Sequence, residues 1–121
     1  MDDNVILRKS MAFALRIIKL YNYLNDEKRE YVMSKQVLRC GTRIGAKAHE
    51  AHNAESTRDF LITMNQALKD ASETEYWLMI LSQSGYFSDR QYTDILADCV
   101  ELKKILTATV KTMKTRVNID H

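Results

Sequence analysis

Apolar residues recur at steps of three and four along most of the chain, which is the period of an α-helix that buries one side. The clearest such stretch is residues 56–85. Ser56 followed by Asp59 resembles a capping box, because a serine hydroxyl can accept from the free N–H groups at a helix start. Gly85 predicts the end, since glycine adopts the left-handed conformation that stops a helix. The buried stripe comprises Phe60, Met64, Ala67, Leu68, Ala71, Leu78 and Leu81.

The same periodicity predicts four helices in all. Their approximate ranges are residues 4–24, 27–52, 56–84 and 89–116. Short links between helices of this length favour antiparallel neighbours. We therefore expect a single domain over residues 1–121, with the all-α fold of an antiparallel up-down-up-down four-helix bundle.

Polar residues mark the links between these helices. Asn25-Asp26-Glu27 can cap the second helix, and Ser88 with Gln91 forms a capping box for the fourth. The fourth helix should fray near Arg116, so residues 117–121 are expected to form a loose tail.

The first helix carries more apolar surface than one core requires. One stripe comprises Leu7, Met11, Ala14, Leu15, Ile18 and Tyr21, and a second comprises Ile6, Phe13, Ile17, Leu20 and Leu24. A surface helix needs roughly three apolar positions in seven to face its core. Either this helix is central in the monomer or another subunit covers its outer side. Because a bundle this small cannot surround a helix, we favour subunit contact, and assign it to Phe13, Ile17, Leu20 and Leu24.

Two features interrupt the apolar stripes of the middle helices. Gly41 and Gly45 stand one turn apart in the second helix, where glycine is unfavourable, so they indicate close approach of another backbone. Tolerated surface glycines are the alternative. Thr74 and Glu75 fall in the stripe of the third helix, and a carboxylate there needs a partner because an unpaired buried charge is costly.

Composition supports the all-α class and indicates in which cellular compartment the protein functions. The 121 residues include no proline and three glycines, fewer than strands joined by tight turns require. Cys40 and Cys99 lie in helical patterns without metal-ligand spacing, which indicates inert thiols in a reducing compartment. No apolar run approaches a membrane span, and the N-terminus is unlike a signal peptide. We expect a cytoplasmic protein without membrane contact.

The net charge of +2 is unevenly distributed, with a basic first half and an acidic middle. The second helix carries a row of four cations at i, i+4 spacing, Lys35, Arg39, Arg43 and Lys47. Like charges at this spacing repel, so the row needs compensation. Nucleic-acid phosphates could supply it, and so could Glu50, Glu73 and Glu75 as a structural polar network. A charge run is usually a solvated or internally paired face, and both interpretations stay open.

Motifs for catalysis or metal binding are missing from the sequence. The di-iron sites of helix bundles need Glu-x-x-His pairs, and no glutamate stands three residues before His49, His52 or His121. His49 and His52 lack a clear third ligand for zinc. Tyr76-Trp77 could stack a base, although aromatic residues at helical spacing more often form core or subunit contacts. We predict no enzyme activity, no cofactor and no small-molecule substrate.

Four segments of the chain resemble a known family. They are residues 38–51, 55–60, 67–78 and 84–86, and they look like the small bacterial four-helix bundle proteins encoded in intervening sequences of 23S ribosomal RNA genes. That family is similar to the accessory variability determinant proteins of diversity-generating retroelements. The family pattern Ser-Ile-x-x-Asn-Ile-x-Glu-Gly aligns with residues 43–51, where Glu50 matches but Lys47 and Ala51 depart. Its Glu-x-Glu matches Glu73 and Glu75.

The resemblance implies a ring of five subunits without known enzymatic activity. For the retroelement relatives it also implies binding of nucleic acid and of a reverse transcriptase through a basic surface. Our leading hypothesis is therefore a homopentamer that binds RNA, DNA or a nucleoprotein through Lys35, Arg39, Arg43 and Lys47. The alternative is a structural or protein-interaction scaffold in which these cations neutralise acids of the same assembly.

Overall fold

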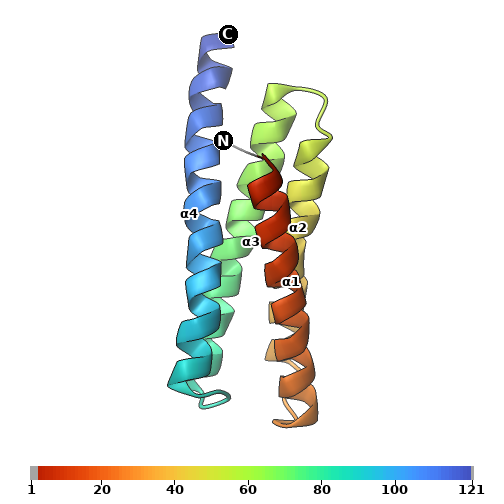
Figure 1. Ribbon diagram of the computed structural model, residues 1–121, viewed down its shortest axis with the longest axis vertical. Helices are drawn as coiled ribbons and strands as arrows, with labels where there is room; N and C mark the ends of the chain where they lie inside the picture. Colours follow the sequence, from red (N-terminus) through yellow and green to blue (C-terminus); the bar gives the residue numbers. More distant parts are fainter. Residues whose placement is uncertain (1–2, 121) are drawn as a thin grey trace.

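Four helices make up the fold in the computed structural model, which describes residues 3–120. They are α1 (Asp3–Asp26), α2 (Met33–His52), α3 (Thr57–Gln83) and α4 (Asp89–Asp120). Successive helices run in opposite directions, and α4 continues beyond the upper end of the others (Figure 1). The predicted all-α antiparallel four-helix bundle is confirmed.

The predicted signals at both ends of α3 are present. The Ser56 hydroxyl accepts from the Asp59 N–H at 3.1 Å. Gly85 adopts a φ of 81°, and the Tyr86 N–H donates to the Leu81 carbonyl at 3.0 Å, which together close the helix in a Schellman motif. Next to it, Ser88 and Gln91 exchange both hydrogen bonds of a capping box at the start of α4.

The predicted start of α2 at residue 27 is wrong, because a buried acid opens this helix six residues later. Residues 27–32 form an irregular connection in which Arg29 has a φ of 51°. The buried Glu30 carboxylate accepts from three backbone N–H groups, those of Val32, Met33 and Ser34, at 2.7–3.1 Å. It thus satisfies the free donors of the helix start, a role predicted for Asn25-Asp26-Glu27.

The predicted tail is also wrong, since α4 stays helical through Asp120. The last residue, His121, lies outside the described part of the chain.

The side of α1 that faces the core is opposite to the predicted one. Phe13, Ile17 and Leu24 are almost completely buried within the single chain, and Leu20 packs against the same core. Side chains that the monomer already covers cannot form the surface that a second copy would cover, so this assignment of the subunit interface is wrong. Three residues of the first stripe supply the uncovered surface instead, whereas Leu7 of the same stripe packs against the core.

The uncovered surface of α1 consists of three large apolar side chains at i, i+4 and i+7. Met11 is 51% exposed, Leu15 is 55% exposed and Ile18 is 41% exposed. Their spacing places them on one side of the helix. We call Met11, Leu15 and Ile18 the α1 patch.

Close packing of α1 on α2 depends on the two glycines. A Cβ at Gly41 would lie 2.8 Å from Ile17 Cγ1, and one at Gly45 would lie 3.3 Å from Ser10 Oγ and 3.4 Å from the Ser10 backbone oxygen. The predicted close approach is therefore present, with α1 as the neighbour. The α2–α3 and α3–α4 pairs also pack closely, whereas α1 and α4 touch much less.

We predict that Gly41→Ala destabilises the protein. Overpacking a core costs roughly 1–3 kcal/mol, and alanine regains about 1 kcal/mol in helix propensity. The free energy of unfolding, measured by urea denaturation, should therefore fall by up to about 2 kcal/mol. In an Ile17→Ala background, which removes the clashing atoms, the same change should cost nothing. Stabilisation by Gly41→Ala in the unchanged chain would contradict the close packing.

Candidate nucleic-acid interface

The predicted basic row lies along α2, but its four cations have different surroundings. Lys35 and Arg39 are exposed, and neither side chain is ion-paired with an acid of the described residues. Arg43 and Lys47 are partly buried and both are ion-paired. Half of the row is thus available to an external anion, and the other half is occupied by carboxylates of the same chain.

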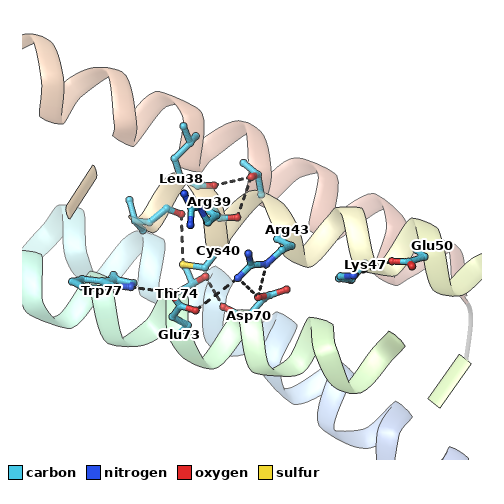
Figure 2. A network of polar contacts seen from close by, with 12 residues as sticks. Leu38, Arg39, Cys40, Arg43, Lys47, Glu50, Asp70, Glu73, Thr74 and Trp77 are labelled. Atoms are coloured by element: carbon cyan, nitrogen blue, oxygen red, sulfur yellow. Dashed lines mark hydrogen bonds and ion pairs between the residues drawn. The ribbon is translucent and has the colours of Figure 1, made fainter. Parts of the chain in front are cut away.

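Arg43 is held by a buried acid of α3. Its Nε and Nη2 atoms each lie 2.8 Å from Asp70 Oδ1, and Nη2 lies 3.8 Å from Glu73 Oε1 (Figure 2). The Asp70 side chain is only 9% exposed. The hydrogen bond with Asp70 raises the pKa of the Arg43 guanidinium, and the charges of both acids add to this effect. Arg43 therefore serves as the counter-ion of a buried carboxylate.

Asp70 was not among the predicted site residues, although its spacing carries a signal. It stands four residues before Thr74, so both polar side chains fall on the buried side of the same helix. The Thr74 hydroxyl donates to the Asp70 carbonyl at 2.7 Å, which satisfies this interruption of the apolar stripe without a ligand. Two polar residues at i, i+4 within an apolar stripe indicate a buried network here.

The predicted acids Glu50, Glu73 and Glu75 do not form one network. Glu73 accepts from Trp77 Nε1 at 3.1 Å and lies beside Arg43. Figure 2 shows Glu50 further along α2, where it pairs with Lys47 at 3.1 Å. The third acid, Glu75, faces α4 and pairs with Lys103 at 2.9 Å. Each acid thus compensates a cation, in three separate places.

Two aromatic residues of α3, Tyr76 and Trp77, follow Glu73 and Glu75 in the sequence. The two rings meet edge to face, with centroids 5.3 Å apart. Tyr76 is exposed, whereas Trp77 packs against the core. Only one of the two rings therefore has a largely open side for stacking.

Groups with catalytic or metal-binding potential are dispersed or buried in the described residues. Burial raises the pKa of the Cys99 thiol to about 12 and also raises that of Cys40, so both thiols stay protonated near neutral pH. His49 and His52 are exposed. Among residues 3–120, no three His, Cys, Asp or Glu side chains come together as a metal site. In the same part of the chain, no helix is long and apolar enough to span a membrane.

Comparison with known proteins identifies close relatives of the chain. The profile described as 23S rRNA-intervening sequence protein matches residues 2–108. A solved structure from Bacteroides thetaiotaomicron VPI-5482, a protein of unknown function from the S23 ribosomal protein family, is 49% identical in sequence. The match covers 92% of this chain and 99% of that chain, with a TM-score of 0.90. The curated proteins contain no match.

We predict that Arg43→Met destabilises the fold much more than Lys47→Met. The first change leaves the buried Asp70 carboxylate without its cation, which should cost about 2 kcal/mol because Arg43 itself is partly solvated. The matched control breaks only the partly exposed Lys47–Glu50 pair, worth a few tenths of a kcal/mol. Urea denaturation measures both values, and equal losses would show that Arg43 has no special structural role.

Proposed function

This chain belongs to the 23S rRNA-intervening sequence protein family, and we propose that it is a non-enzymatic scaffold that assembles with copies of itself through the α1 patch. The observation that carries this proposal is the row formed by Met11, Leu15 and Ile18, which the single chain leaves uncovered. The proposed activity needs no cofactor, no small-molecule substrate and no membrane, and it is compatible with a cytoplasmic setting.

The size of the α1 patch supports self-association. Complete burial of a fully exposed large aliphatic side chain is worth roughly 1.5–3 kcal/mol. The three side chains of the patch are about half exposed, so covering each would stabilise an assembly by about half of that value. Three such side chains in one row therefore provide a contact core of the apolar kind that is found in protein interfaces. Arg43 and Lys47 are paired with acids of the same chain, so they stabilise the fold and are not free to bind nucleic acid. This also favours a scaffold.

We take a ring of five subunits as the proposed assembly, following the family resemblance. Such a ring would have five times the mass of the 14.1 kDa chain. It would also repeat the net charge of +2 on each subunit, so that exposed cations recur around its surface.

A second candidate function is binding of RNA, DNA or a nucleoprotein such as a reverse transcriptase. The observation in its favour is that Lys35 and Arg39 remain exposed one turn apart on α2. Phosphate contacts of this kind weaken steeply with salt. Titration of RNA and DNA at two salt concentrations tests this candidate, and unchanged mobility of the nucleic acid at low salt would remove it.

We predict that Leu15→Arg converts the assembly into single chains without loss of the fold. An arginine in the middle of the patch cannot be covered without removing its charge from water. Sedimentation velocity measures the mass, and the circular dichroism spectrum should still be that of a folded helical chain because Leu15 lies outside the core.

The matched control is Ile62→Arg, which places the same residue at a 51% exposed position of α3. This variant should keep the mass of the unchanged protein. If Leu15→Arg also keeps that mass, the α1 patch is not the contact surface.

A further inference from the structure

A cavity of about 390 Å³ lies at the end of the bundle where α2 passes into α3. Residues 51–60 form one wall, from the last turn of α2 to the first turn of α3, and residues 109–116 of α4 form the other. Figure 1 shows the α2–α3 link and the end of α4 at the upper end of the molecule. Sites for small molecules occupy roughly 300–1,000 Å³, so the cavity has room for one small ligand. We call it the end cavity.

The charged side chains that line the end cavity are basic. Arg116 and His52 are among them, and the other polar lining residues are serine and threonine. None of the described lining residues is acidic. The two acids of residues 51–60, Glu55 and Asp59, instead line a separate hollow together with Lys47. A cleft whose charges have one sign attracts ligands of the opposite sign, so the end cavity favours an anion.

The hydrogen-bond donors of the end cavity suit a phosphate group in particular. The Arg116 guanidinium presents several N–H groups in one plane, a geometry that matches phosphate oxygens. Ser56 Oγ accepts from the Asp59 N–H at 3.1 Å, which leaves the hydroxyl proton of Ser56 for another acceptor. Thr109 differs, since its hydroxyl donates to the Ile105 carbonyl at 3.0 Å. A phosphate offers more oxygen atoms than a carboxylate to accept from this set.

The remaining lining of the end cavity is apolar. Ala51 is 1% exposed, and Phe60 packs against the core, so this wall has a fixed base. Met113 is partly buried and lines the α4 side. Methionine and aromatic side chains adapt well to a flat apolar group. The end cavity therefore suits a ligand that joins an apolar part to its anionic group.

The α4 wall exists because this helix continues where a loose tail was predicted. Thr109, Met113 and Arg116 stand at steps of four and three residues, which places them on one side of α4. All three lie beyond residue 108, where the match to the family profile ends. The continued helix fixes the position of Arg116, and the end cavity thus depends on a part of the chain outside that match.

We propose that the end cavity binds a small organic phosphate. The phosphate group lies among Arg116, His52 and Ser56, and the apolar part of the ligand lies against Phe60 and Met113. None of the described lining residues belongs to α1, so the site is separate from the α1 patch. The proposal does not depend on self-association and adds a ligand to the scaffold.

Titration with adenosine monophosphate tests the site, because this molecule joins a phosphate to an apolar ring system. Isothermal titration calorimetry should show one molecule bound to each chain. Adenosine lacks the charge, and inorganic phosphate lacks the ring. Each of these partial ligands should therefore bind at least about tenfold more weakly, since it loses either the charged hydrogen bonds or the apolar contact.

Two matched substitutions in the same turn of α4 locate the bound phosphate. Arg116→Met should weaken binding of adenosine monophosphate by about tenfold or more, because it removes charge-assisted hydrogen bonds. The control is Lys114→Met, which removes an exposed cation that is not among the residues lining the cavity. It should leave the affinity unchanged. Circular dichroism checks that both variants are folded, as expected for exposed positions.

Methyl NMR of the methionine residues gives a second readout. Adenosine monophosphate should shift the signal of Met113 and leave that of Met11, which lies in the α1 patch, in place.

The other outcomes overturn the proposal. Neither heat nor a shift of Met113 at millimolar ligand would show that the cavity takes up only water. Equal losses from the two substitutions would show unspecific attraction to the cations of α4. Adenosine that binds as tightly as its monophosphate would show that the cavity does not select an anion. None of these results bears on the mass of the unchanged protein, so they leave the proposed self-association as a separate question.

Discussion

Apolar side chains on two sides of α1 are the constraint on which the structure depends. One side, with Phe13 and Ile17, forms the core of the single chain, and the other exposes Met11, Leu15 and Ile18. A four-helix bundle has room for each helix on one side only, since no helix can be surrounded by the other three. The exposed side stays in contact with water in the single chain. In the proposed assembly, another copy would cover this side and remove its apolar surface from water.

Most buried polar groups of the bundle stabilise the fold and fix how the helices align with one another. Asp70 is buried and neutralised by Arg43, and Glu30 caps the start of α2 from within the core. All buried side-chain nitrogen and oxygen atoms of the described residues have a hydrogen-bond partner. Such groups raise the specificity of the fold because a slipped register would leave a buried charge unpaired. The ion pairs between α1 and α4 differ in that they lie at the surface, from Lys9 to Glu101 and from Arg16 to Asp94 and Asp98.

The helices and their caps could be predicted because local rules govern them. Ser56, Gly85 and the pair of Ser88 with Gln91 act through backbone groups within a few residues, so their roles follow from spacing alone. Glu30 escaped prediction because its capping depends on an irregular turn that no periodic pattern encodes.

Properties that depend on tertiary contacts could not be predicted in the same way. Two stripes of similar hydropathy on α1 do not reveal which one meets α2, because that choice follows from the glycines of the neighbouring helix. Asp70 was missed for a related reason, since the partner that allows its burial stands 27 residues earlier in the chain. The acids assigned to one network are dispersed because each faces a different helix.

The most direct test of this account is sedimentation equilibrium of the unchanged protein over a range of dilutions. The account predicts a mass that is a multiple of the 14.1 kDa chain and that falls towards one chain only on strong dilution. A fully folded single chain at every concentration would contradict it, because the second apolar side of α1 would then be stable in water without a partner.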